Sequence, residues 1–341
     1  MALSLRVRYL VNPGPINRNV TSLMAHGKTE ILTPDAAGIA RVADLLRAGQ
    51  LVALPTETVY GLAGDATSDI ACARIYEAKG RPRLNPLIVH LPSSGAVARV
   101  AVLNDTARAL ANAFWPGALT MVLPLRDGHG LSPSVTAGLS TVAIRVPAHP
   151  AMRAVLAAFG GPLAAPSANP SGRISPTTAA HVLAGLGGRI AAVVDGGPCG
   201  VGVESTIVAP GGSGTRLLRD GGIPREAIEA LTGALVSDMT PGRVEAPGQL
   251  SSHYAPVAPL VVNSPLDDPG AIRVGFGPVE ADLTLSVNGD LTEAATNLFA
   301  ILHEADARAG RRGAAAIHVA PIPDTGLGRA INDRLRRAAS R

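Results

Sequence analysis

Short apolar runs alternate with helical patterns along residues 31–232. Apolar residues recur at helical spacing in 39–49 and in 69–79, where Ser68 can cap the helix and Gly80 can end it. Another helix is predicted at 224–231, with proline in its first turn. The apolar runs predict strands at 51–54, 87–91, 119–123, 142–146, 163–165, 191–194, 206–208 and 216–218. This alternation predicts an α/β domain built on an open, twisted sheet of mixed direction with helices.

A second, smaller domain is predicted after residue 258. Residues 233–258 carry several prolines and glycines and are interpreted as a linker. Asp290 and Glu293 have the spacing of a capping box at the start of a helix over 291–309. Strands are expected near 260–262, 272–276, 283–287 and 317–319, and a last helix from Leu327. Residues 259–341 therefore predict a Rossmann-like α/β domain, whereas residues 1–30 lack periodicity and predict a loosely ordered extension.

Composition limits the class of protein. A chain of 341 residues exceeds what one core usually supports, which agrees with two domains. Two cysteines, Cys72 and Cys199, are too few for a disulfide framework or a cysteine zinc site. Arginines interrupt the apolar start of the chain, and prolines and glycines break the charge-free run between Arg153 and Arg173, so neither a signal peptide nor a membrane span is predicted. We expect a cytoplasmic protein.

The basic balance, a net charge of +4, raises the question of nucleic-acid binding. Aromatic residues make up only 3% of the chain, so no stacking surface is predicted. Basic residues gather only near the end, at Arg329, Arg334, Arg336, Arg337 and Arg341. We interpret this group as the solvated face of a terminal helix, and direct tRNA binding is the less favoured alternative.

Polar residues follow the predicted strands at several points. Lys79 and Arg81 lie beside the segment that follows the strand at 51–54, and of the 30 basic residues only Lys28 and Lys79 are lysine. An ammonium beside a guanidinium suits a polyanion such as a nucleotide triphosphate. Alternatively, Lys79 is simply an exposed charge in a last helical turn, where the helix dipole stabilises it by about 0.3–1 kcal/mol.

Common nucleotide-binding loops are absent, so side chains and strand ends would hold the phosphates. No complete P-loop or glycine-rich dinucleotide loop occurs. Arg145 and Arg219 end apolar runs and are further candidates for anion contacts. The alternative for both is an ion pair with a nearby carboxylate, Asp220 or Glu204.

Seven ordered segments carry a resemblance to a known family. They are PTETVYGL (55–62), KGRPRLNPLIVH (79–90), WPGALT (115–120), TVAIRVPAHP (141–150), APSANPSG (165–172), ESTIV (204–208) and LLRDG (217–221). Together with SHYAP (252–256), they resemble the L-threonylcarbamoyladenylate synthase family in its long form, which has a YrdC-like domain, a linker and a C-terminal Sua domain. This resemblance implies a YrdC-like fold for 31–232.

The resemblance implies a role for each matching residue. Catalytic roles carry over to Lys79, Arg81, Ser167 and Asn169. Contacts with ATP carry over to Arg81, Asn85, Thr141, Ser167, Ser175, Arg219 and, from the linker, Tyr254. Contacts with L-threonine carry over to Thr58, His90, Arg145, Ala165 and Ser205. His90 is expected to position threonine rather than to accept a proton, and no residues are assigned to a metal site.

The implied reaction joins L-threonine, bicarbonate or carbon dioxide, and ATP into threonylcarbamoyl-AMP and releases pyrophosphate. Mg²⁺ is expected on the phosphates, and a separate tRNA threonylcarbamoyl transferase is the expected downstream partner. An aromatic pair in the linker, His253 and Tyr254, suggests that the linker acts as a lid. The alternatives are a related carbamoyltransferase, which would need further segments, and a noncatalytic RNA-binding module, which would not need the Lys79, Arg81, Ser167 and Asn169 set.

Overall fold

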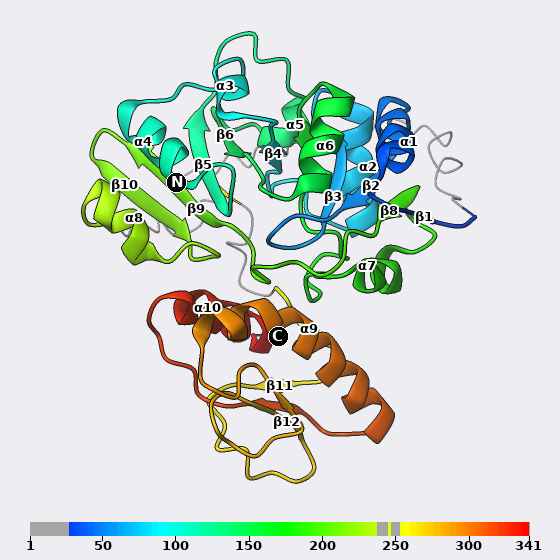
Figure 1. The fold of residues 1–341 in the computed structure, drawn as a ribbon, viewed down its shortest axis with the longest axis vertical. Coiled ribbons are helices and arrows are strands. Elements are labelled where there is room, and N and C mark those ends of the chain that lie inside the picture. The colour runs from blue at the N-terminus through cyan, green and yellow to red at the C-terminus, as the bar shows by residue number, and fades with distance from the viewer. Residues whose placement is uncertain (1–26, 237–244, 247–252, 341) are drawn as a thin grey trace, which may run out of the picture.

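The computed structural model describes residues 27–236, 245–246 and 253–340. Within these ranges the chain forms a large domain on a ten-stranded sheet and a small domain on a four-stranded sheet (Figure 1). Residues 1–26 of the predicted extension lie outside the described residues. Most of the predicted linker also lies outside them.

The elements of the large domain alternate along the chain. Its strands are β1 (Glu30–Leu32), β2 (Val52–Leu54), β3 (Gly61–Asp65), β4 (Ile88–His90), β5 (Leu119–Pro124), β6 (Thr141–Arg145), β7 (Leu163–Ala164), β8 (Ala192–Val194), β9 (Thr206–Gly211) and β10 (Gly214–Arg219). Its helices are α1 (Ala36–Arg47), α2 (Asp69–Lys79), α3 (Ser94–Val97), α4 (Asp105–Phe114), α5 (Pro133–Thr136), α6 (Pro150–Phe159), α7 (Ala179–Leu186) and α8 (Arg225–Thr232).

The large sheet mixes parallel and antiparallel neighbours. Its strand order is β1-β8-β2-β3-β7-β4-β6-β5-β9-β10. For example, β4 and β6 are parallel, whereas β7 runs antiparallel to β4 and β5 runs antiparallel to β6. The predicted mixed α/β fold is therefore confirmed.

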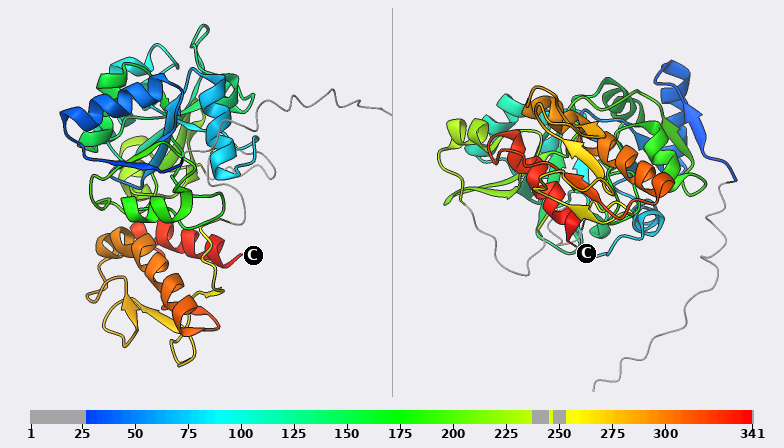
Figure 2. Two further views of the ribbon diagram at one scale, coloured as in Figure 1. Left: turned by 90° about the vertical axis from the view of Figure 1, so that its right-hand side faces the viewer. Right: turned by 90° about the horizontal axis from the view of Figure 1, so that it is seen from below.

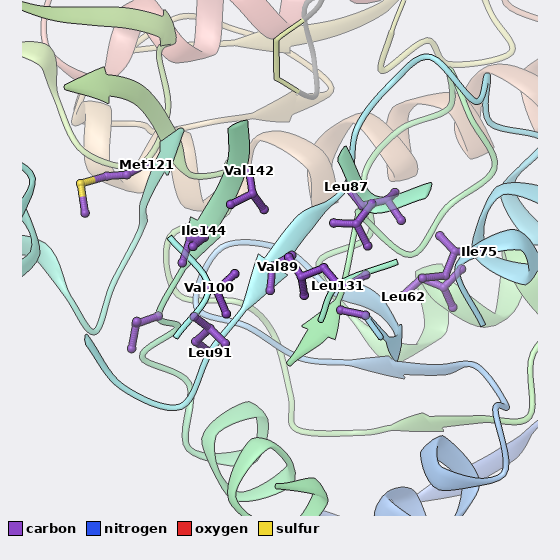
Figure 3. Close-up of a cluster of buried hydrophobic side chains, with 14 of the residues drawn as sticks. Leu62, Ile75, Leu87, Val89, Leu91, Val100, Met121, Leu131, Val142 and Ile144 are labelled. Atoms are coloured by element: carbon purple, nitrogen blue, oxygen red, sulfur yellow. The ribbon is translucent and has the colours of Figure 1, made fainter. Parts of the chain in front are cut away.

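Helices cover both faces of this sheet. Successive side chains of a strand point to opposite faces, so each face carries apolar side chains that pack against helices. In β2, Val52 and Leu54 belong to the apolar cluster under α1 and α6, whereas Ala53 belongs to the cluster on the opposite face. Figure 2 shows α1 and α6 on one side of the sheet and α2 on the other. Apolar side chains of β4 and β6, such as Val89 and Ile144, belong to the cluster on this opposite face, together with Ile75 of α2 (Figure 3).

Local signals account for α2, the helix that ends at Lys79. The Ser68 side chain accepts a hydrogen bond from the Ala71 N–H, and Gly80 closes the helix with φ of 60°.

Strand β3 was not predicted, because its sequence, GLAGD, has two glycines and no β-branched residue. Tertiary packing explains Gly64, since a Cβ there would lie 3.0 Å from the Leu51 side chain and 3.2 Å from Ile75.

The small domain contains four strands and two helices. These are β11 (Leu260–Val261), β12 (Ile272–Gly275), β13 (Leu283–Thr284), α9 (Leu291–Arg312), β14 (Ile317–Val319) and α10 (Leu327–Ala339). All strand pairs in the order β11-β14-β12-β13 are parallel, as expected for a Rossmann-like domain. Asp290 caps α9 through the Glu293 N–H, but the Glu293 carboxylate accepts from the Ser286 hydroxyl instead of completing a capping box.

Helices α9 and α10 lie between the small sheet and the large domain (Figures 1 and 2). Val59 and Val203 of the large domain join the apolar cluster formed around Phe299 of α9. The contact is close, because a Cβ on Gly202 would lie 2.3 Å from the Ala295 carbonyl oxygen. The expectation of a solvated basic helix is wrong for Arg334, which is fully buried in this interface.

Candidate active site

A cavity of about 50 Å³ lies where the strand ends of the large domain meet the small domain. Because β4 and β6 are parallel and in register, their last residues, His90 and Arg145, are neighbours. Ala165 follows directly on β7, and Ser205 directly precedes β9. The cavity is lined by Thr58, Val59, Arg81, Ile88, His90, Arg145, Ala165, Pro166, Ser167, Glu204, Ser205, Arg219, His253 and Tyr254.

Arg145 forms a buried polar cluster on one side of this cavity. Its Nη1 donates to Thr58 Oγ1 at 2.8 Å, and its Nη2 donates to Glu57 Oε1 at 2.6 Å. Burial alone would raise the pKa of Glu57, but Arg145 and the Ala148 N–H hold it below its usual value. The predicted alternative of a carboxylate partner holds for Arg145, but with Glu57 instead of Asp220 or Glu204.

Ser205 lies within a second cluster. Its hydroxyl shares a hydrogen bond of 2.7 Å with Thr120 Oγ1. Nη2 of Arg219 donates to the Ser205 carbonyl oxygen at 2.8 Å and to Ser205 Oγ at 3.2 Å. Two hydroxyl groups and a guanidinium therefore meet beside the cavity, where they can pair with polar groups of a small ligand.

Lys79 is buried, so the alternative of an exposed charge at a helix end is wrong. Its side chain is 3% exposed, and its Nζ donates to the carbonyl oxygens of Ser167 and Asn169 at 2.6 Å each. Burial, together with Arg81, lowers the pKa of Lys79 well below its usual value. The Lys79 Nζ therefore shapes the loop at 166–169, and Lys79 is not among the residues that line the cavity.

Arg81 is held by the backbone of the following turn. Its Nε donates to the Asn85 carbonyl oxygen at 3.2 Å, and its Nη2 donates to the Pro86 carbonyl oxygen at 2.9 Å. Burial lowers the pKa of Arg81 to about 10, so the guanidinium remains charged at neutral pH.

The side-chain oxygens of Asn85 and Asn169 are buried and have no hydrogen-bond partner among the described residues.

His90 is neutral in this site. Burial, followed by the nearby Arg145, lowers its pKa to about 3. A group with so low a pKa is a poor general base near neutral pH. Its buried Nδ1 has no partner among the described residues, so it can accept a hydrogen bond from a ligand.

The structure brings together most of the residues proposed from the sequence. Thr58, Arg81, His90, Arg145, Ala165, Ser167, Ser205, Arg219 and Tyr254 line the cavity, whereas Lys79, Asn85, Asn169 and Ser175 are buried and are not among the lining residues. Thr141 stands apart, because it begins β6 whereas Arg145 ends that strand. Thr141 is not among the residues that line the cavity.

Three residues of the site were not assigned from the sequence. Glu57 fixes Arg145, and Glu204 lines the cavity while it accepts hydrogen bonds from Ser175 Oγ at 2.6 Å and Arg334 Nε at 3.0 Å. Glu57 and Glu204 occur inside the quoted segments, where their neighbours could have drawn attention to them. Arg334 gave no signal of its own, because it lies in a different domain more than a hundred residues away.

Two aromatic residues from the end of the predicted linker close the cavity. The rings of His253 and Tyr254 meet edge to face, with centroids 4.1 Å apart. The Tyr254 ring also stacks on Phe299 of α9 at 5.6 Å. Tyr254 is 1% exposed and has φ of 67°, a strained value for a residue other than glycine.

The described residues offer no metal site of their own. No group of three or more histidine, cysteine or acidic side chains in these ranges could hold an ion. Glu204, the carboxylate that lines the cavity, already accepts hydrogen bonds from Ser175 and Arg334.

Among the described helices, none is both long and apolar enough to span a membrane.

Comparison with known proteins identifies the family. Residues 44–221 match the family described as Telomere recombination, and residues 223–340 match the family described as Threonylcarbamoyl-AMP synthase, C-terminal domain. The chain is 43% identical to the threonylcarbamoyl-AMP synthase of Bacillus subtilis, over 91% of this chain and 95% of that protein. The chain belongs to the threonylcarbamoyl-AMP synthase family. The resemblance inferred from the sequence is therefore confirmed.

Further relatives of this threonylcarbamoyl-AMP synthase family member cover both domains. The threonylcarbamoyl-AMP synthase of Pyrococcus abyssi is 39% identical over 87% of this chain and 92% of that protein. The crystal structure of P. abyssi Sua5 complexed with L-threonine superposes with a TM-score of 0.83 at 36% identity, covering 91% of this chain and 98% of that one. The two-domain architecture is thus shared with a protein that binds L-threonine.

Proposed function

We propose that this protein synthesises L-threonylcarbamoyl-AMP from L-threonine, bicarbonate or carbon dioxide, and ATP, with release of pyrophosphate. The observation that carries the proposal is the cavity in which Arg145, Thr58 and Ser205 converge with Arg81 and Arg219. The activity agrees with the family to which the chain belongs. It supplies the threonylcarbamoyl group for the modification of adenosine in tRNA, and a separate tRNA threonylcarbamoyl transferase would consume the product.

Arg145, Thr58, His90, Ala165 and Ser205 would bind L-threonine. The guanidinium of Arg145 provides a cation for the carboxylate, because arginine pairs well with planar anions. Short hydroxyl side chains can pair with the threonine hydroxyl, and the free Nδ1 of His90 offers a further acceptor. The Glu57 carboxylate keeps the Arg145 fork in place, since it accepts from Nη2 at 2.6 Å.

ATP would bind beside the threonine site. Arg81 and Arg219 supply positive charge for the phosphates, and Ser167 lies in the loop that Lys79 holds. Asn85 and Asn169 contribute unpartnered amide oxygens, which can accept hydrogen bonds from the nucleoside. Ser175 and Tyr254 complete the proposed nucleotide contacts. Thr141 remains a proposal from the family resemblance.

The chemistry requires alignment and charge stabilisation. Threonine and bicarbonate condense to a carbamate with loss of water, and a carbamate oxygen then attacks the α-phosphorus while the bond to pyrophosphate breaks. Buried, preorganised cations such as Arg81 stabilise the charge that moves onto the leaving group. The described residues hold no cluster of three or more histidine, cysteine or acidic side chains, so Mg²⁺ would be held mainly by phosphate oxygens and water.

Pyrophosphate release tests this proposal. The purified protein with ATP, L-threonine and bicarbonate should release pyrophosphate, and omitting either threonine or bicarbonate should abolish the release. Release that continues without threonine would indicate a different reaction, such as that of a carbamoyltransferase. A protein that binds RNA but releases no pyrophosphate would indicate a noncatalytic module.

A further inference from the structure

Arg334 projects from α10 of the small domain into the rear of the candidate active site. Its side chain is 0% exposed, although arginine is rarely buried unless it is paired. Nε donates to Glu204 Oε2 at 3.0 Å, and Nη1 donates to the Asp220 carbonyl oxygen at 2.6 Å and to Asp333 Oδ2 at 3.0 Å. The guanidinium carbon lies 5.5 Å from the centre of the Tyr254 ring. Arg334 therefore links the small domain to both Glu204 and Tyr254.

Glu204 transmits this contact to the cavity. One carboxylate oxygen accepts from Arg334, while the other accepts from Ser175 Oγ at 2.6 Å. The carboxylate is also near charged and titratable groups from three other places in the fold, namely Lys79 of α2, Arg219 of β10, and the neighbouring residues His253 and Tyr254. Burial would raise the pKa of Glu204, but Arg334 and then Arg219 hold it below its usual value. The carboxylate is therefore ionised and fixed.

An ionised Glu204 determines what Ser175 can offer a ligand. A serine hydroxyl has one donor and two acceptor positions, and here the proton of Ser175 is committed to Glu204. Ser175 Oγ is therefore left as an acceptor. It would accept from a donor group of the nucleoside, such as a ribose hydroxyl or the adenine amine, and would not contact a phosphate oxygen.

We propose that Arg334 is a positioning residue of the nucleotide site, which fixes the Glu204 carboxylate so that Ser175 accepts a hydrogen bond from the nucleoside. The inference rests on the proposed function, because it assigns Ser175 to ATP. It gives the small domain a direct part in nucleotide affinity. Separation of the two domains would remove Arg334 from Glu204 and weaken ATP binding at the same time.

The test is Arg334→Met, which keeps an unbranched apolar side chain but removes the guanidinium with its charge and donors. We expect the KM for ATP to rise by about tenfold or more, with the KM for L-threonine within about twofold of the parent value. Arg329→Met is the matched control, because Arg329 lies on the same helix and pairs with Glu226 of the large domain at the partly exposed rim. It should leave both KM values unchanged. Equal losses for ATP and threonine in Arg334→Met would overturn the proposal.

The pH profile separates positioning from simple packing. Without Arg334, burial raises the pKa of Glu204, so its ionised form exists only at higher pH. The kcat/KM for ATP of Arg334→Met should therefore fall as the pH is lowered from about 8.5 to 6, whereas the parent protein stays flat over that range. Arg334→Lys, which restores a charge, should recover part of the affinity and the flat profile. A flat profile in Arg334→Met would contradict the role given to Glu204.

A double variant covers the case in which Arg334→Met does not fold. Combining Arg334→Met with Glu204→Gln removes the buried, unpaired carboxylate and should restore stability. Positioning predicts that the KM for ATP stays raised in this variant, whereas a purely structural role predicts that it returns to normal. Protection of the protein by ATP against thermal unfolding gives the same comparison without turnover, so a failure of the proposed reaction would be distinguished from a failure of this inference.

Discussion

Some side chains of the candidate active site line the cavity, whereas others form hydrogen bonds that keep the lining residues in place. Arg145 and Arg81 line the cavity, whereas Glu57 and Lys79 fix them or the loop beside them through short hydrogen bonds. These supporting residues should tolerate substitution poorly, because removal of one partner leaves the other, a buried polar group, unsatisfied. Substitutions of supporting residues should therefore affect stability and activity together.

Lys79→Ala is expected to reduce pyrophosphate release by about 100-fold or more, because the 166–169 loop loses the donor that holds two of its carbonyl oxygens. It should also lower the free energy of unfolding by about 1–3 kcal/mol, since two carbonyl oxygens lose a buried donor. Urea unfolding and a pyrophosphate assay measure the two effects. Lys28→Ala is the matched control, because Lys28 is the other lysine of the chain and is exposed. A folded Lys79→Ala protein with normal turnover would refute the assignment.

The amino-acid pocket should reject valine. Thr58 and Ser205 bring hydroxyl groups to the cavity, and a site built to pair a substrate hydroxyl is left unsatisfied when that hydroxyl is missing. We expect kcat/KM for valine to be about 10⁴-fold below that for threonine. Serine is the matched comparison, because it keeps the hydroxyl and lacks only a methyl group, so its loss should be only about 10–200-fold. Valine within tenfold of threonine would mean that the pocket reads shape alone.

At the scale of the elements, strand ends of the large domain form much of the site, and His253 and Tyr254 complete its lining. The cavity of about 50 Å³ is far smaller than the volume of roughly 300 Å³ or more that ligand pockets usually have. Tyr254 lines it from a backbone conformation that costs energy, and its ring packs on Phe299. We therefore expect His253 and Tyr254 to move when ATP binds.

Tyr254→Ala should separate pyrophosphate release from product recovery. A closed site keeps water from the mixed anhydride that the reaction forms, so loss of the ring should raise the KM for ATP and shorten the lifetime of the product. The measurement is the ratio of intact threonylcarbamoyl-AMP to pyrophosphate during turnover. Tyr254→Phe keeps the stacking on Phe299 and should behave like the parent. An unchanged ratio in Tyr254→Ala would leave Tyr254 with a packing role only.

At the scale of the whole molecule, the two domains meet through neutral histidines as well as ion pairs. His181 of α7 and His303 of α9 stack with ring centroids 4.0 Å apart, and His303 Nε2 donates to the Ser175 carbonyl oxygen. Burial lowers the pKa of His303 to about 4 and that of His253 to about 3. Both residues lie in or beside the interface, so their charge state is coupled to the contact between the domains.

Acid should therefore destabilise the folded molecule. Such a histidine has a lower pKa in the folded protein than in the unfolded chain, where its pKa is about 6.5. Its contribution to stability is fully present above pH 6.5 and is lost as the pH falls towards the pKa of the folded state. We expect the free energy of unfolding to fall by about 1.4 kcal/mol per pH unit for each such histidine below pH 6.5. Urea unfolding from pH 8 to 5 measures the slope, and His303→Gln should reduce it. Equal slopes in the two proteins would show that His303 does not titrate on unfolding.

The sequence by itself was sufficient for many of the elements and for the family. Helix α2 begins and ends where Ser68 and Gly80 predict, because capping and left-handed closure are local interactions. Apolar runs gave the strands that carry His90 and Arg145, since a buried strand leaves its mark on consecutive residues. The site residues near these strands could be proposed because ordered family segments surround them.

Only the tertiary structure decided which charges are buried and what they contact. Lys79 has the sequence context of an exposed last-turn lysine, yet the 166–169 loop covers it. Arg334 has the context of a solvated basic helix, yet it lies against Glu204 across the domain interface. Strand β3 likewise forms where Gly64 fits against Leu51 and Ile75. Burial depends on residues distant in the chain, and no local pattern of hydrophobic and polar positions encodes them.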